Sequence, residues 1–187
     1  HDDAKTVCST CGTGGKAYRI RIYDQENPDI EAPTRTIGQI GGMGGCLMLG
    51  YFDNQAATED SFNGAGDFLS GDLGMLDERG NLHVMGRLKD MIIRGGHNIF
   101  PTKIEDLAIK HPGIAKAAAF PVADERLGER VCLAVLASSQ GAPDVETLLR
   151  HLFNLGLSKY DMPEFFLEMD AFPLTASGKI LKRELAE

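Results

Sequence analysis

The first half of the chain alternates short apolar runs with turn-forming residues, a pattern typical of β-strands. Residues 17–23 alternate Tyr and Ile with Arg and predict a strand that ends at a polar turn over Asp24–Pro28. The apolar run Leu47–Tyr51 predicts a further short strand. We expect the preceding glycine-rich segment, Gly41–Gly45, to be a flexible hairpin or a bulge.

A hairpin is expected near the end of this half. The turn-forming residues 77–80 separate two apolar runs, Leu73–Leu76 and Leu82–Met85, and such an arrangement favours two antiparallel strands. Seventeen of the 22 glycines lie before residue 97. The first half therefore predicts a small, mostly β unit.

The second half has the longer apolar periods of helices and buried strands. Thr102 and Glu105 form a capping-box pattern and predict a helix that ends near Pro112–Gly113. The near-continuous apolar runs Ile114–Phe120 and Val131–Ala137 predict strands that are covered on both faces.

A second helix and a last strand complete this half. Asp144 is expected to cap a helix, and Glu164–Met169 predicts a strand. One face of the helix carries the apolar residues Val145, Leu148, Leu149, Leu152 and Phe153. The order helix, strand, strand, helix, strand predicts an α+β layer of about a hundred residues. The expected fold class is α+β, with a β-rich subdomain followed by a short central sheet flanked by helices.

The charge and hydropathy of the chain exclude several kinds of partner. The chain has 187 residues, 27 of them acidic and 19 basic, with a net charge of −8. Nucleic-acid binders normally carry a basic stripe, so no nucleic-acid partner is expected. Lys and Arg are scattered singly along the chain, which also argues against an anionic membrane surface as a partner. No apolar run is long enough for a membrane span.

The four cysteines do not indicate a metal site. Cys8 and Cys11 form a C-x-x-C pair, but Cys46 and Cys132 stand alone. A zinc site needs a second pair or a close Cys/His cluster, so we expect no metal to be bound by this chain. Reduced thiols fit a cytoplasmic protein.

Three short stretches carry the candidate chemistry. They are Ser70–Gly74, then Gly86–Asp90 running into Arg94–Pro101, and finally Pro173–Ile180 with the letters P-L-T-A-S-G-K-I. In this order and spacing they resemble the motifs of the adenylate-forming superfamily, which includes acyl- and aryl-CoA synthetases, peptide-synthetase adenylation domains and luciferases. The resemblance covers nearly the whole chain.

The resemblance implies a role for each matching residue. Asp72 matches the aspartate that binds both ribose hydroxyls of ATP or AMP, and an ionised carboxylate suits two such donors. Arg87 matches an arginine that reaches the nucleotide near its ribose or phosphate. Lys89 occupies the hinge position. Lys179 matches the catalytic lysine of the first half-reaction, where a cation stabilises charge on the phosphoryl oxygens.

The loop after Arg94 matches the segment of the family that serves the second half-reaction. Gly95 and Gly96 would leave a narrow tunnel for the pantetheine arm of CoA, and a tight hairpin turn is the alternative interpretation of the same two residues. Arg94 is a candidate for binding a CoA phosphate. His97 is a weaker candidate for catalysis, and a capping role is sufficient to account for Glu105.

Two family motifs are not found in this sequence. One is the Ser/Thr/Gly-rich phosphate loop that ends in Pro-Lys, and the other is the Tyr-Gly-x-Thr-Glu stretch that helps to hold phosphate and Mg²⁺. In full-length relatives both lie upstream. The resemblance therefore implies the C-terminal third of a larger enzyme: residues 1–86 are the last, β-rich subdomain of the large lobe, and residues 87–187 are the mobile C-terminal domain.

The resemblance implies an acid–CoA ligase as the complete enzyme. Its substrates would be a small carboxylic acid, ATP and CoA, its Mg²⁺ ligands would lie upstream, and the N-terminal lobe would be the partner of this chain. The Gly-Gly-x-Asn-Ile-Phe-Pro form of residues 95–101 favours this ligase over an adenylation domain that loads a carrier protein. A catalytically inactive stand-alone domain is the non-enzymatic alternative, and we expect the isolated chain to be inactive.

Overall fold

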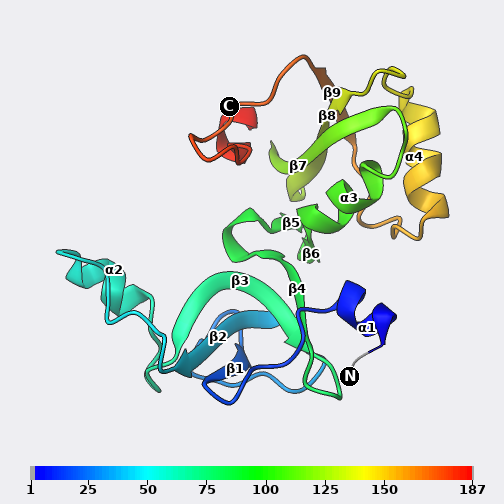
Figure 1. The fold of residues 1–187 in the computed structure, drawn as a ribbon. Coiled ribbons are helices and arrows are strands. Elements are labelled where there is room, and N and C mark those ends of the chain that lie inside the picture. Colours follow the sequence, from blue (N-terminus) through cyan, green and yellow to red (C-terminus); the bar gives the residue numbers. More distant parts are fainter. Residues whose placement is uncertain (1–2, 187) are drawn as a thin grey trace. The chain divides into compact units, whose positions relative to one another are not determined.

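The computed structural model describes residues 3–186, and the chain forms two compact units, His1–Lys89 and Asp90–Glu187 (Figure 1). The α+β fold class expected from the sequence is confirmed. The short 3-10 turn η1 (Leu88–Asp90) spans the boundary between the units.

Unit 1 is built on a four-stranded antiparallel sheet. Its strands, in the order β1-β2-β3-β4, are Tyr18–Tyr23, Gly38–Gly44, Phe68–Leu76 and Leu82–Arg87. Two six-residue helices accompany the sheet, α1 (Ala4–Ser9) and α2 (Gln55–Asp60). The strand expected over residues 17–23 and the hairpin expected around residues 77–80 are confirmed.

The prediction of a strand at Leu47–Tyr51 is wrong. That segment is irregular, and the glycine-rich segment before it forms β2 instead. The glycines of β2 allow close approach to β1. A Cβ added at Gly41 would lie 2.8 Å from the Tyr23 ring, so only glycine fits beside this buried aromatic side chain. The flexible hairpin or bulge expected at Gly41–Gly45 is therefore wrong for most of that segment, and the one register shift against β3 lies just before it, between Gln39 and Gly41.

A buried carboxylate links β1 to the start of β3. Asp67 is fully buried and accepts hydrogen bonds from the Tyr23 hydroxyl and from Arg19 Nη2, the latter at 2.9 Å. Burial alone would raise the pKa of Asp67, but these two donors outweigh it and hold the pKa below its ordinary value. The charge is buried because it is paired.

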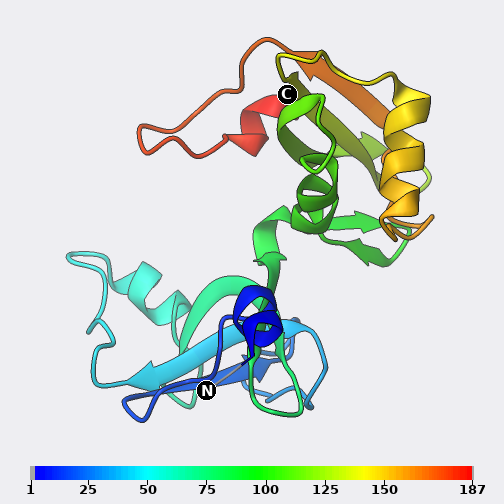
Figure 2. The ribbon, with the colours of Figure 1, turned by 45° about the vertical axis from the view of Figure 1, so that its right-hand side comes forward.

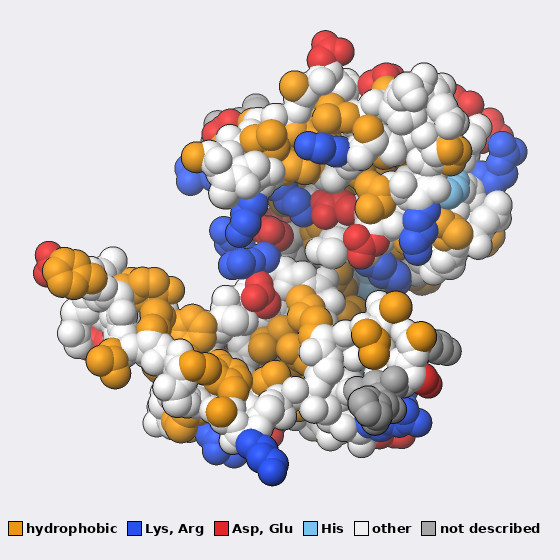
Figure 3. Space-filling view, in the orientation of Figure 1, with side chains coloured by type: hydrophobic (Ala, Val, Ile, Leu, Met, Phe, Trp, Pro, Cys, Tyr) orange, Lys and Arg blue, Asp and Glu red, His pale blue; other side chains and the backbone are white. Residues whose placement is uncertain are grey.

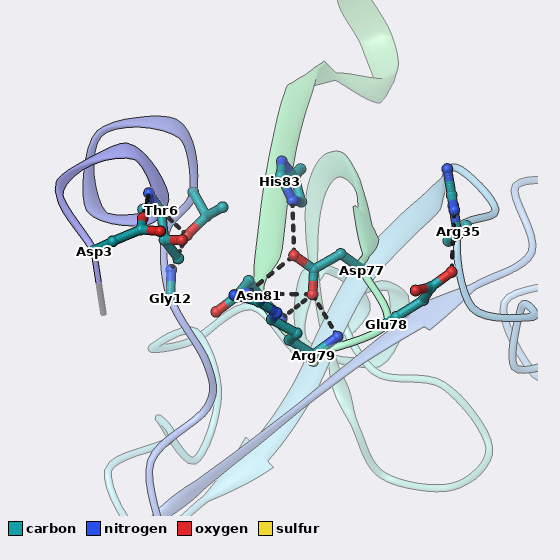
Figure 4. A network of polar contacts seen from close by, with 10 residues as sticks. Asp3, Thr6, Gly12, Arg35, Asp77, Glu78, Arg79, Asn81 and His83 are labelled. Atoms are coloured by element: carbon teal, nitrogen blue, oxygen red, sulfur yellow. Dashed lines mark hydrogen bonds and ion pairs between the residues drawn. The ribbon is translucent and has the colours of Figure 1, made fainter. Parts of the chain in front are cut away.

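The β3–β4 turn is organised by Asp77, as Figure 4 shows. Its carboxylate accepts from the backbone amides of Arg79 and Asn81, from the Asn81 side chain, and from His83 at 3.3 Å. The hydrogen bonds from Asn81 contribute most to holding the pKa of Asp77 well below its usual range. The turn starts the β3–β4 hairpin, and a register shift between Leu73 and Gly74 then brings Asp72 opposite Arg87.

Unit 2 is a five-stranded sheet covered by helices on one face and by the C-terminal segment on the other. Its strands are β5 (Ile92–Arg94), β6 (His97–Ile99), β7 (Ile114–Asp124), β8 (Gly128–Ala137) and β9 (Phe165–Met169). Its helices are α3 (Pro101–Ala108), α4 (Val145–Asn154) and α5 (Lys182–Leu185). The path β6-β5-β8-β7 is antiparallel, and β9 pairs with β8 in parallel.

The strands β7 and β8 are apolar on both faces, as the sequence predicted. On one face Ala117, Leu133 and Val135 pack with the helices in a core that includes Ile104 and Leu152. On the other face the buried residues are Ala118, Phe120, Cys132, Ala134 and Phe172, and Ile180 and Leu185 pack against them. This second core anchors the C-terminal segment to the sheet.

Two expectations about the helices of unit 2 need correction. The predicted Thr102–Glu105 capping box is wrong, because α3 begins at Pro101 and its N-cap residue, Phe100, makes no side-chain hydrogen bond. The helix also ends at Ala108, before the expected end near Pro112–Gly113. Asp144 does cap α4, accepting from Thr147 N at 2.9 Å.

The buried face of α4 is narrower than the apolar pattern suggested. Leu148 and Leu152 are buried in the core, but Val145 and Phe153 are about half exposed. A ten-residue helix that lies on one side of a sheet buries only the stripe that faces the sheet.

Candidate functional site

Asp72 and Arg87, both expected to bind nucleotide, lie directly opposite each other on β3 and β4. Arg87 Nε is 2.8 Å from Asp72 Oδ1, and both side chains remain partly exposed. Gly71, with a φ of 73°, turns the backbone just before Asp72, and Ser70 Oγ accepts from the Asp72 amide at 3.1 Å. Within residues 3–186 nothing else is bonded to the carboxylate, so Asp72 Oδ2 can accept further hydrogen bonds.

Gly95 and Gly96 form the tight turn of the β5–β6 hairpin, in which Arg94 pairs with His97. Their φ angles are 58° and 83°, and a two-residue hairpin loop with both φ values positive is a type I′ turn. The Gly95 amide also donates to Leu127 O at 2.7 Å, outside the hairpin. The tight-turn interpretation is therefore correct, and a role in a pantetheine tunnel stays a prediction.

Arg94 is held within unit 2. Its guanidinium lies 2.5 Å from Glu164 Oε1 and donates to the carbonyls of Tyr160 and Met162. The side chain is only 15% exposed. These contacts fix the start of the hairpin to the loop before β9, and a contact between Arg94 and a CoA phosphate stays a prediction.

A pocket of about 580 Å³ opens beside this hairpin. It is lined by Arg94, Gly95, His97, Leu127, Tyr160 and Glu164. His97 is half exposed and its Nε2 lies 2.9 Å from Asp161 Oδ1, and a catalytic role for His97 stays a prediction. Asp161 also pairs with Lys103. Neither Asp161 nor Lys103 belongs to a motif that the sequence analysis recognised.

Lys179 lies at the base of a small exposed loop before α5. The loop is closed by the bridge between Leu174 and Ile180 and by a hydrogen bond that the Thr175 amide donates to the Lys179 carbonyl. Thr175 Oγ1 also accepts from the Lys179 amide at 3.0 Å. Among the described residues no side chain pairs with the Lys179 ammonium, which leaves this cation available for a ligand.

Glu105 has a role that local sequence did not predict. Its Oε1 accepts from the Ala119 amide at 2.7 Å and lies 2.6 Å from Lys182 Nζ. Glu105 thus connects α3, β7 and α5. Its partner in α5, Lys182, lies three residues after Lys179. Glu105 supports the C-terminal end of the Lys179 loop rather than the start of its own helix.

The predicted site residues fall into three places. Asp72 and Arg87 lie together in unit 1, Lys89 is exposed in η1, and the others lie in unit 2. In Figure 2 the β5–β6 hairpin and the red segment before α5 point to opposite sides of unit 2. Among residues 3–186 no three His, Cys, Asp or Glu side chains gather as a metal-binding group.

The comparison with known proteins decides the family. Residues 103–179, all within unit 2, match the AMP-binding enzyme C-terminal domain. The chain is also 36% identical over 173 residues to the mitochondrial medium-chain acyl-CoA ligase ACSF2 of Mus musculus. The chain belongs to the adenylate-forming superfamily. The alignment with ACSF2 covers 92% of this adenylate-forming chain and 27% of ACSF2.

Solved adenylate-forming enzymes have the same fold. The o-succinylbenzoate CoA synthetase MenE of Bacillus subtilis, in complex with its acyl-adenylate intermediate, is similar with a TM-score of 0.88 and 29% identity over 96% of this chain. ATP-bound MatB of Rhodopseudomonas palustris is similar with a TM-score of 0.85 and 31% identity over 95% of this chain. The chain spans 36% and 35% of these two proteins.

Proposed function

We propose that this chain is the C-terminal region of an acid–CoA ligase, which activates a carboxylic acid with ATP and transfers the acyl group to CoA. The observation that carries the proposal is that unit 2 presents two distinct loops on opposite sides, the loop that carries the unpaired Lys179 ammonium and the Gly95–Gly96 hairpin. Each of these two surfaces would serve one of the two successive reactions. The names of ACSF2, a medium-chain acyl-CoA ligase, and MenE, an o-succinylbenzoate CoA synthetase, support this choice.

In the first reaction a carboxylate oxygen of the acid bonds to the α-phosphorus of ATP. The bond between that phosphorus and pyrophosphate breaks, and acyl-AMP forms. Negative charge develops on the phosphoryl and bridging oxygens, where the unpaired ammonium of Lys179 would stabilise it. Asp72 would hold the ribose hydroxyls with its free oxygen, and Arg87 would orient Asp72 and face the nucleotide.

In the second reaction the thiol of CoA loses its proton, the sulfur bonds to the acyl carbon, and AMP leaves. Gly95 and Gly96 have no side chains, and a Cβ added at Gly96 would meet no atom within 4 Å. This supports an open path for a thin pantetheine arm beside the hairpin.

The remaining parts of the proposal concern the rest of the enzyme. Lys89, in η1 at the boundary of the units, would be the hinge about which unit 2 turns between the two reactions. Mg²⁺ and the acid would be bound by residues of an upstream lobe. Leu49 and Phe52 are fully exposed and Figure 3 shows further apolar side chains on unit 1, a surface suited to contact with that lobe.

A carrier protein is the alternative acyl acceptor, and the tight glycine hairpin suits the pantetheine arm of either acceptor. A cytoplasmic location also stays a prediction. None of the helices in the described part of the chain combines the length and the apolar run that crossing a bilayer requires.

The proposed function is tested with the full-length protein that carries this chain. We expect it to release pyrophosphate from ATP only when a suitable carboxylic acid is present, and to convert the adenylate to acyl-CoA when CoA is added. The measurement is pyrophosphate release and acyl-CoA formation over a panel of medium-chain and aromatic acids. Acyl transfer to a carrier protein but not to CoA would favour the alternative. The isolated 187-residue chain should show no acid-dependent ATP–pyrophosphate exchange, and detecting exchange would contradict the proposal.

The Gly95→Asn variant separates the two interpretations of the glycine hairpin. Asn-Gly is a preferred pair for a type I′ turn, so the turn should be kept. The added Cβ would lie 3.3 Å from Leu127 Cδ2, the flexible end of a side chain that can shift. We expect acyl-CoA formation to slow by about 100-fold, because a displacement of roughly 1 Å at a reacting group has that effect. Adenylation should be unchanged.

The matched control is Gly141→Asn, another positive-φ glycine, with a φ of 80° and no atom within 4 Å of an added Cβ. It should affect neither reaction. If Gly95→Asn leaves acyl-CoA formation intact, the glycine pair serves the turn alone.

A further inference from the structure

We propose that Asp161 is a positioning residue for the thioester-forming reaction, because its buried carboxylate fixes the Gly95–Gly96 hairpin in place through His97. The inference rests on the proposed function and adds to it a residue that matched no motif. Asp161 lies in the loop between α4 and β9, far in sequence from the hairpin that it holds.

Asp161 connects three elements of unit 2. Its Oδ1 is 2.9 Å from His97 Nε2 on β6, and its Oδ2 is 3.3 Å from Lys103 Nζ on α3. The carboxylate is largely buried, whereas the side chains of His97 and Lys103 are 49% and 47% exposed. A buried carboxylate is stabilised by hydrogen-bonded partners, so Asp161 draws both exposed groups towards one fixed point.

The same loop holds the hairpin on both sides of the glycine pair. Arg94, just before the glycines, contacts Tyr160 O, Met162 O and Glu164, and His97, just after them, contacts Asp161. The Tyr160 ring also lies 6.0 Å from the His97 ring. Because Gly95 and Gly96 have no side chains to pack, their position depends on these flanking contacts and on the bond from Gly95 N to Leu127 O.

The predicted consequence is selective. Loss of the Asp161–His97 contact releases one side of the hairpin, while the Lys179 loop, whose ribbon points to the other side of the unit (Figure 2), keeps its own supports at Glu105 and Phe172. Asp161 is not part of either apolar core of unit 2. The thioester-forming reaction should therefore be impaired and adenylation should not.

The first experiment uses the 187-residue chain and does not depend on activity. In His97→Ala and Asp161→Asn we expect amide hydrogen exchange across Ile92–Ile99 to accelerate by about tenfold, the effect of losing one charge-assisted hydrogen bond. His97→Gln keeps an amide donor at this site and should restore slow exchange. Exchange in the Lys179 loop should not change. The matched control is Arg35→Gln, which breaks the exposed Arg35–Glu78 pair in unit 1. Unchanged exchange across the hairpin in both variants would overturn the inference.

The second experiment uses the full-length enzyme. In His97→Ala the kcat for acyl-CoA formation should fall by about tenfold, and ATP–pyrophosphate exchange should be unaffected. In His97→Gln the kcat for acyl-CoA formation should recover. The defect should be equal at pH 7 and above pH 9, where a thiol with a pKa of about 8.5 is already ionised. A defect that disappears at high pH would mean that His97 removes the thiol proton, which would overturn a positioning role. If the wild-type enzyme makes no acyl-CoA, the proposed function fails, and the exchange experiment still decides whether Asp161 anchors the hairpin.

Discussion

The Lys179→Ala variant of the full-length enzyme should form acyl-adenylate about 100- to 1,000-fold more slowly, the usual loss when one preorganised group that stabilises the transition state is removed. In this chain the Lys179 ammonium has no partner among residues 3–186. Its removal therefore breaks no ion pair within the described fold, and the lost rate can be attributed to the reaction.

The measurement compares two half-reactions. Acid-dependent ATP–pyrophosphate exchange should be lost, whereas acyl-CoA formation from supplied acyl-adenylate should persist, because the cation is needed only while pyrophosphate departs. Lys116→Ala, at another exposed lysine of unit 2, is the control and should leave both activities unchanged. Equal loss of both half-reactions in Lys179→Ala would contradict the role proposed for Lys179.

The Asp72→Asn variant should lower kcat/KM for ATP by roughly 100-fold, since hydrogen bonds to a charged group each contribute about 1.5–3 kcal/mol. Asp72 pairs with Arg87 through Oδ1 and has a free Oδ2 for the ribose hydroxyls. The amide has the same shape as the carboxylate but lacks its charge, and one of its two acceptors becomes a donor.

Deoxynucleotides make this test specific. The wild-type enzyme should discriminate strongly against 2′-deoxy-ATP and 3′-deoxy-ATP, and Asp72→Asn should lose most of that discrimination. Asp60→Asn, at an exposed carboxylate on α2 of the same unit, is the control. Retained discrimination in Asp72→Asn would show that other groups bind the ribose.

Local signals explain which elements the sequence predicted correctly. The alternation over residues 17–23, the turn at Asp77 and the cap at Asp144 depend on residues a few positions apart, and all three are present in the structure. The prediction of a strand at Leu47–Tyr51 failed because a strand forms only where it can pair with another, and the glycine-rich β2 takes the place between β1 and β3. The prediction of a capping box failed because α3 already begins at Pro101, one residue before Thr102, and because Glu105 binds Lys182 instead.

By itself the sequence determined the family, the α+β class and the motif residues, because short motifs and apolar periods are local properties of a chain. The tertiary structure alone decided which of these residues meet. Asp72 joins Arg87 only through the register of β3 and β4, and Asp161 reaches His97 across 64 positions of sequence. Contacts between polar side chains far apart in the chain leave no periodic signal, since they depend on how sheets and loops close in space.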